Sequence, residues 1–309
     1  MKTLRTVLTG LIALPLLAGV LSAQSIDVTV EAGLNAAIDF ANANPGSADT
    51  LKLVTDGGDY PLTPVHIEQP MVIMAAPGLA TAPTIYADPT TDENDFITID
   101  ADLTVMGLTI DGQGPDGVYG KFKYMFKVNN PPADDGSFTT PSLYVYDSDL
   151  RNVYAIGTPE GATDGNFFDI SRTAYAENVH FHRTTFTGSG DEGVRSINAH
   201  KEPVHPNGTA IGSLQIIDCT FDNINGSAIK IESDGDPESY DGEVTIDHVT
   251  FNNCQRRVFW ERDYVGSTFT NIIIANSKTG NDTFGGTDAL VSHQREAVSY
   301  THLTLPTSG

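Results

Sequence analysis

The chain repeats one short pattern, in which alternating apolar residues end at a large apolar side chain and a glycine or asparagine follows two places later. Six copies align on that large side chain: Ile110, Leu150, Phe186, Phe221, Phe251 and Ile274. The residues two places further on are Gly112, Asn152, Gly188, Asn223, Asn253 and Asn276. Glycine and asparagine tolerate the left-handed backbone of a tight bend. A strand and bend that recur at intervals of 23 to 40 residues predict a solenoid of stacked coils, with the six large side chains in one inward column.

A second set of strands precedes the first in every repeat, for example Phe167–Ser171 before Val179–Thr187. The unequal intervals favour an all-β, right-handed parallel β-helix, because its turns vary in length while its strands stay stacked. Residues 24–60 predict an N-terminal cap with first strands and a short helix, whose apolar face carries Leu34, Ile38 and Ala41. We expect the β-helix proper to span residues 61–296.

Both ends of the chain are interpreted as segments outside the fold. Residues 1–23 begin with Lys2 and Arg5, continue with a mainly apolar stretch and end in small residues, which is typical of a bacterial signal peptide. Residues 297–309 contain Val298–Thr307, which resembles the translation of a sequencing-library adapter. We therefore expect a secreted protein, extracellular or periplasmic, and a β-helix that is truncated at its C-terminal end. The alternative for the tail is a natural polar C-terminus.

The charge of the chain narrows its range of partners. Lys and Arg total 17 against 40 Asp and Glu, so the formal net charge is -23. Nucleic acids and anionic membrane surfaces both require a basic face, so neither is an expected partner. Beyond the leader, no stretch is apolar for long enough to span a bilayer. Cys219 and Cys254 leave two states open, a pair of buried thiols or one disulfide, of which the thiols are favoured.

The chain resembles pectate-lyase-like right-handed parallel β-helix proteins in three features. These are the N-terminal cap, the column of asparagines at the bends, and the repeated strand pattern, of which Leu214–Asn223 is an example. Within that group the chain is most similar to chondroitinase B and the related alginate lyases, over about residues 26–280. The resemblance implies a polysaccharide lyase that cleaves an anionic, uronate-containing polysaccharide by β-elimination. A different class stays open, namely a non-catalytic glycan-binding or adhesin-like surface protein with the same fold. We expect the full-length protein to be a monomer.

Alternate positions of the second strand set predict two outward columns on rungs about 4.8 Å apart. The first column is Thr98, Lys127, Asp169, Ser196, Lys230 and Phe259. The second is Asp100, Asn129, Ser171, Asn198, Glu232 and Glu261. Asn198, Glu232 and Glu261 offer hard oxygen ligands on three successive rungs, which predicts a Ca²⁺ site. The resembled lyases hold calcium with an Asn and glutamates on adjacent rungs. The alternative is a solvated polar face.

Lys230 and Arg195 are the candidate catalytic residues. β-Elimination needs a base for the proton next to the sugar carboxylate and a cation for the charge that develops there. The alternative is that Lys230 is ion-paired with carboxylates beside it. The chain departs from the resembled lyases, which place the catalytic lysine a few residues after the ligand glutamates, whereas Ser233–Gly235 follows here. Those lyases also carry an Arg-His-Gly on the next rung, which this chain lacks.

Further cations flank these residues and are predicted to bind the substrate. The segment Asp191–Lys201 is the densest group of reactive side chains, and it opens a long loop of the kind that walls a groove on a rigid scaffold. His200 and Lys201 lie in it. The remaining predicted substrate-binding residues are Arg256, Arg257 and Arg262 on the next rung. The alternative for the loop is an exposed polar segment.

Overall fold

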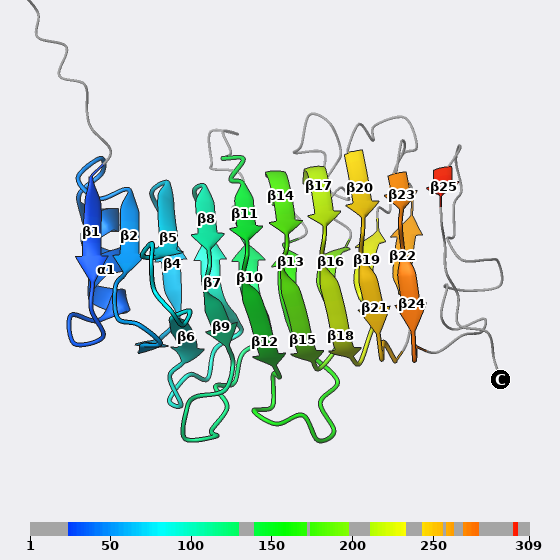
Figure 1. Cartoon of the computed structure of the whole chain (residues 1–309), viewed down its shortest axis with the longest axis horizontal. Helices are drawn as coiled ribbons and strands as arrows, with labels where there is room; N and C mark the ends of the chain where they lie inside the picture. Colours follow the sequence, from blue (N-terminus) through cyan, green and yellow to red (C-terminus); the bar gives the residue numbers. More distant parts are fainter. Residues whose placement is uncertain are drawn as a thin grey trace, which may run out of the picture.

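The computed structural model describes residues 24–129, 139–171, 174–197, 211–232, 243–255, 258–262, 268–277 and 299–301. Within these residues the strands form three parallel sheets, called A, B and C here, that run side by side along the long axis of the molecule (Figure 1). The chain passes through sheets C, A and B in that order in each coil, for example through β7, β8 and β9. The architecture is the right-handed parallel β-helix that the sequence predicts.

The bounds of the strands follow sheet by sheet. Sheet A consists of β1 (Ser25–Val28), β2 (Thr50–Leu53), β5 (Met71–Ala75), β8 (Leu103–Met106), β11 (Leu143–Tyr146), β14 (Ala176–His182), β17 (Ile211–Ile217), β20 (Glu243–Asp247), β23 (Thr268–Thr270) and β25 (Ser299–Thr301). Sheet B consists of β3 (Asp59–Leu62), β6 (Thr84–Ala87), β9 (Thr109–Asp111), β12 (Asp149–Val153), β15 (Thr185–Ser189), β18 (Thr220–Ile224), β21 (Thr250–Asn252) and β24 (Ile273–Ala275). Sheet C consists of β4 (Val65–Ile67), β7 (Asp95–Ile99), β10 (Tyr124–Val128), β13 (Asn166–Ile170), β16 (Val194–Ile197), β19 (Ile229–Glu232) and β22 (Phe259–Arg262).

The predicted inward column lies in sheet B and is confirmed. The strand register pairs its six members one after another: Ile110, Leu150, Phe186, Phe221, Phe251 and Ile274. All six side chains are buried. The rings of Phe186 and Phe221 are nearly parallel with centroids 4.3 Å apart, and Phe251 continues the stack at 5.2 Å from Phe221. This column is the centre of a core that extends through all three sheets.

The bend after sheet B uses the left-handed backbone that the sequence predicts. A positive φ occurs at five of the six predicted positions: Asn152, Gly188, Asn223, Asn253 and Asn276. Gly112 is the exception, and a Cβ atom there would lie 1.8 Å from the backbone oxygen of Asn152. Glycine is therefore required at that position by close backbone approach rather than by φ. Asn253 donates from its side-chain amide to the amide oxygen of Asn223 at 3.2 Å, a hydrogen bond along the axis of the β-helix.

A second bend, between sheets A and B, differs from the prediction. The apolar alternation predicts single strands such as Leu103–Asp111. In the structure each of these segments is two strands, separated by a residue with a left-handed backbone and one inward-facing residue. The left-handed residues are Gly107, Asp147, Arg183, Asp218, His248 and Asn271. Alternation of apolar residues continues through the bend, so periodicity alone does not reveal it. Arg183 tolerates the conformation while forming two hydrogen bonds, of 2.6 and 2.9 Å, with the carboxylate of Asp147.

The N-terminal cap contains the predicted short helix, α1 (Leu34–Ala43), which lies at the N-terminal end of the stacked strands (Figure 1). Its buried residues are Leu34, Ile38 and Ala41, the face that the sequence predicts. No helix in the described part of the chain is long and apolar enough to cross a membrane. The predicted signal peptide, residues 1–23, lies outside the described residues.

At the opposite end, the three-residue strand β25 pairs in parallel with β23 and adds one more strand to sheet A. The adapter-like residues were expected to lie outside the coil, and that expectation is wrong for Ser299–Thr301. The reason is that the last strand of a stack presents unpaired backbone groups, which a further segment can satisfy by pairing with it. The origin of this segment stays a prediction.

Both cysteines are free and buried, as predicted. Burial raises the pKa of the Cys219 thiol to about 12 and that of the Cys254 thiol to about 12. The Cys219 thiol donates to the backbone oxygens of Phe181 and Ile217 at 3.3 and 3.2 Å. These thiols therefore act as small core residues and contribute no reactive thiolate at neutral pH.

Candidate functional site

The outward positions of sheet C line up along the β-helix and carry most of its buried charge. The strand register gives the column as His66, Thr98, Lys127, Asp169, Arg195, Lys230 and Trp260. Four members of the predicted first column are confirmed: Thr98, Lys127, Asp169 and Lys230. Because the strands lie about 4.8 Å apart, neighbours in the column are within contact distance of one another.

Two members of the predicted column are wrong by one residue. Arg195 stands where Ser196 was expected, because Ser196 pairs with the buried Ile231. Phe259 likewise pairs with the buried Ile229, which leaves Trp260 in register with Lys230. A shift of one residue moves every side chain of a strand to the other face, so the correction brings the candidate residue Arg195 into the column beside Lys230.

Asp169 is the anchor of the cluster and is only 2% exposed. Arg195 donates from Nε to Asp169 Oδ1 at 2.8 Å and from Nη2 to Oδ2 at 3.3 Å, a two-pronged pairing. Lys127, 8% exposed, forms a further ion pair with Oδ2 of the same carboxylate. Removal of one partner from such a buried pair leaves an uncompensated charge, so these contacts fix the position of Arg195.

Tyr124 provides the aromatic surface of the cluster. Its hydroxyl accepts a hydrogen bond from Arg195 Nη2 at 2.9 Å, and the Lys127 ammonium lies 4.1 Å from its ring centroid. Burial raises the pKa of Tyr124 even though the Arg195 charge opposes the shift, so the phenol stays protonated at neutral pH. Burial also opposes the charge of Arg195, but the hydrogen bonds and the charge of Asp169 outweigh it and hold the Arg195 pKa above its ordinary value.

Glu192 links the two candidate catalytic residues. Its Oε2 lies 3.5 Å from Arg195 Nη1 and its Oε1 lies 3.5 Å from Lys230 Nζ. The side chain is 2% exposed, and its backbone N–H donates to Asn166 Oδ1 at 2.8 Å. Both side-chain contacts of Glu192 are at the long limit for a hydrogen bond, whereas those of Asp169 are short. Glu192 is therefore the more weakly held carboxylate of the cluster.

Asp191 adjoins Glu192 and forms a carboxyl pair with it. Burial, followed by the hydrogen bond to Glu192 and the charge of Glu192, raises the pKa of Asp191 to about 8. Asp191 is therefore mainly protonated at neutral pH. Beside it, the three cations Lys127, Arg195 and Lys230 contact two carboxylates, those of Asp169 and Glu192. Cations thus outnumber carboxylates in these contacts, although the whole chain has a net charge of -23.

Of the other predicted site residues, Asn198, His200, Lys201, Arg256 and Arg257 lie outside the described residues. The backbone of Glu232, Glu261 and Arg262 is described, and Glu232 and Glu261 are not in register with each other. Glu232 pairs with Ile197 on one side and with Arg262 on the other, while Glu261 pairs with the buried Ile231. Among the described side chains, no three His, Cys, Asp or Glu residues converge on a metal position. Calcium binding itself stays a prediction.

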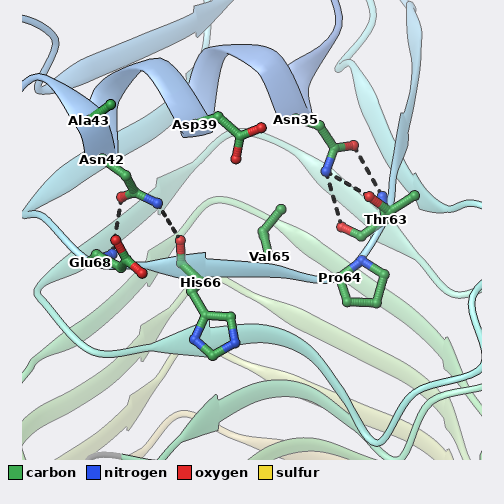
Figure 2. A pocket seen from close by; sticks show the side chains of 9 residues that line it. All are labelled: Asn35, Asp39, Asn42, Ala43, Thr63, Pro64, Val65, His66 and Glu68. Atoms are coloured by element: carbon green, nitrogen blue, oxygen red, sulfur yellow. Dashed lines mark hydrogen bonds between the residues drawn. The ribbon is translucent and has the colours of Figure 1, made fainter.

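A cleft of about 510 Å³ lies between α1 and β4, at the N-terminal end of sheet C (Figure 2). Asn35 donates to the hydroxyl oxygen of Thr63 at 2.8 Å, and Asn42 donates to the backbone oxygen of His66 at 2.7 Å. These amides hold the helix to the chain around β4, and Asp39 projects from the helix between them (Figure 2). The sequence analysis missed the cleft, although two asparagines seven places apart on one helix face were the available signal.

A second hollow of about 560 Å³ shares Pro64, Val65 and His66 with the first and reaches Asp95 and Thr98. Thr98 is in register with Lys127, so the two hollows lead along the outward face of sheet C toward the charged cluster. Burial raises the pKa of Asp95, and the nearby Lys127 opposes the shift. The surface therefore changes along its length from carboxylates and amides near α1 to cations near Lys230.

Known proteins were compared with the chain. A scan of protein-family models gave no match, and a search of curated proteins gave none. Two solved structures of the PL6 family alginate lyase AlyGC, one of them a point mutant, match with TM-scores of 0.52 and 0.51 at 14% sequence identity. Each match covers 91% of this chain and 40% of the lyase chain. The chain thus spans about two fifths of the length of these lyases. At this identity the likeness establishes the fold alone, a parallel β-helix of the kind that a polysaccharide lyase uses.

Proposed function

We propose that the protein is a secreted polysaccharide lyase that cleaves an anionic, uronate-containing polysaccharide by β-elimination on the outward face of sheet C. The observation that carries the proposal is the cationic cluster of Lys127, Arg195 and Lys230, which is locally positive on a strongly acidic chain. An anionic ligand is attracted to this place and repelled elsewhere. The β-helix fold shared with alginate lyases supports the same class of substrate.

In the proposed reaction, Lys230 takes the proton from the carbon next to the sugar carboxylate. Electrons of that C–H bond form the new double bond, the glycosidic C–O bond breaks, and water protonates the departing oxygen. Arg195 stabilises the enolate-like charge on the carboxylate while this happens. Lys230 must first release a proton to the solvent in order to act as the base.

The test is the appearance of the unsaturated 4,5-product, followed by its ultraviolet absorbance during incubation of the whole chain with alginate, pectate or chondroitin. We expect Lys230→Gln to lower the rate at least about a hundredfold, as loss of a general base does. The matched control is Arg183→Gln, which removes an exposed cation at the bend between sheets A and B. Equal activity of the Lys230 variant and the control would rule out the proposed role of Lys230.

One observation favours the second candidate function, a non-catalytic glycan-binding protein. All three cations of the cluster already face carboxylates, and the contact of Lys230 is with Glu192. This arrangement suits retention of an anionic chain without proton transfer. Binding of the three polysaccharides with no unsaturated product from any of them would decide in favour of this second function.

A further inference from the structure

The starting point is the charge requirement of the proposed reaction. The uronate carboxylate is bonded to the carbon that loses its proton, so it needs a positive charge beside it. A bound Ca²⁺ is one way to provide that charge. The predicted calcium ligands do not fit the strand register, because Glu261 pairs with Ile231 and the residue in register with Glu232 is Arg262. A cation thus occupies the register position at which a third oxygen ligand was expected. The described part of sheet C, in contrast, supplies three cations of its own.

The geometry around Glu192 indicates where a substrate carboxylate fits. Arg195 uses Nε and Nη2 for its contacts with Asp169 and Tyr124, all between 2.8 and 3.3 Å. Among the described residues, its remaining group, Nη1, contacts Glu192 Oε2 at 3.5 Å. The other oxygen of Glu192 lies 3.5 Å from Lys230 Nζ. An internal carboxylate thus bridges the proposed neutralising cation and the proposed base.

That position is the one a reacting uronate needs. The carbon that loses its proton is bonded directly to the carboxylate, so a carboxylate paired with Arg195 Nη1 brings that carbon next to Lys230. The contacts of Glu192 with the two cations are the ones that the substrate carboxylate replaces, and at 3.5 Å they are the longest ion pairs of the cluster. Glu192 also has a hydrogen bond to Asp191, which does not depend on either cation. The anchor at Asp169 keeps Arg195 in place during the exchange.

We infer that the substrate carboxylate binds directly to Arg195 Nη1 in the place that Glu192 holds in the free protein, and that this site requires no calcium ion. The inference rests on the proposed function and names the group that recognises its substrate. Glu192 is then a competing internal ligand that lowers affinity for uronates, rather than a catalytic residue.

The first experiment measures calcium directly and does not depend on cleavage. The whole chain is titrated with Ca²⁺ by calorimetry, and binding of acid-hydrolysed, saturated oligomers of alginate and pectate is measured with EDTA or with added Ca²⁺. We expect oligomer affinity to change by less than about twofold between the two conditions. Calcium that binds equally well to the Glu232→Gln variant is bound elsewhere and agrees with the inference. Oligomer binding that requires Ca²⁺, or saturable Ca²⁺ binding that Glu232→Gln abolishes, overturns it.

The second experiment removes the internal competitor. Glu192→Gln keeps the size of the side chain, and we expect it to tighten oligomer binding about tenfold, or lower KM by that factor. Glu177→Gln, an exposed change on β14 of sheet A, is the matched control and should leave affinity unchanged. Unchanged or weaker binding by a folded Glu192 variant overturns the inference. If that variant does not fold, the calcium experiment on the unmodified chain still decides.

The two proposals fail in distinguishable ways. Oligomer binding that is independent of calcium, with no unsaturated product from any polysaccharide, contradicts the lyase function but supports the carboxylate site. Cleavage that occurs only with Ca²⁺ supports the lyase function but contradicts the calcium-independent carboxylate site. Absence of any binding to anionic oligomers in both conditions contradicts both proposals.

Discussion

At the scale of single residues, the proton that Asp191 retains in the folded protein links the charged cluster to the stability of the fold. Burial and the neighbouring carboxyl raise the pKa of Asp191 to about 8, and Arg195 opposes that shift. An unfolded chain releases this proton near the ordinary aspartate pKa of 3.8. Between these two values the folded protein holds more protons than the unfolded protein does, so the free energy of unfolding falls as the pH rises.

We expect Asp191→Asn to remove most of this pH dependence. The variant has no carboxyl proton at this position to lose, so its melting temperature should fall less between pH 5 and pH 8 than that of the unmodified chain. The measurement is thermal unfolding at several pH values across that window. Asp27→Asn, which removes an exposed carboxylate on β1, is the control and should keep the original slope. Identical slopes for Asp191→Asn and the unmodified protein would contradict the raised pKa of Asp191.

At the scale of elements, the sheets differ in how far their register can be predicted from the sequence. In sheet B, β15, β18 and β21 each have one phenylalanine flanked by polar residues, so a single alignment puts Phe186, Phe221 and Phe251 inside. In sheet C, β22 reads Phe-Trp-Glu-Arg and β16 reads Val-Arg-Ser-Ile. Two adjacent aromatic residues, or two adjacent polar ones, fit an alternating pattern in either register. The sequence therefore identifies Lys230 and Arg195 as candidate residues, but it does not predict that the two lie side by side in register.

Contacts between segments far apart in the chain could not be predicted from the sequence, for a related reason. Tyr124 and Arg195 are separated by 71 residues, and only the stacking of β10, β13 and β16 brings them together. Glu192 lies in the segment Asp191–Lys201, which the sequence marks as rich in reactive side chains. Its role depends on its ion pairs with Arg195 of β16 and Lys230 of β19, which the sequence does not reveal. Long-range register, rather than local pattern, is what a single sequence leaves undetermined.

The stacked phenylalanines of sheet B give the prediction that belongs to this scale. Phe221 is fully buried between Phe186 and Phe251, so Phe221→Ala should lower the free energy of unfolding by about 3–5 kcal/mol through lost burial and the cavity that remains. Phe40→Ala, on the half-exposed outer side of α1, is the control and should cost less than about 0.5 kcal/mol. Denaturant unfolding measures both. A loss below about 1 kcal/mol for Phe221→Ala would contradict the tight stack.

At the scale of the whole molecule, the net charge and the charge of the cluster have opposite signs. The chain carries -23, whereas in the cluster around Arg195 the three cations outnumber the two carboxylates, Asp169 and Glu192, that they contact. The repulsion between the chain and a polyuronate acts over the screening length of the solution, which is about 30 Å at 0.01 M salt and about 8 Å at 0.15 M. The attraction between a carboxylate and Arg195 acts over a few ångströms and is partly shielded from solvent. Salt therefore weakens the long-range repulsion before it weakens the local contact.

We accordingly expect the affinity for anionic oligomers to rise several-fold as salt increases from about 0.01 to 0.15 M, and to fall again only at higher salt. A protein that binds polyanions through a basic face shows the opposite trend, a steady loss of affinity with salt. The measurement is a titration with saturated alginate oligomers over a series of NaCl concentrations, with an uncharged glucan oligomer as the control ligand. A steady fall from the lowest salt would mean that the oligomer meets a basic surface larger than the cluster. Enhancement by salt would instead place recognition at a small cationic site within an acidic protein, which is the arrangement that sheet C provides.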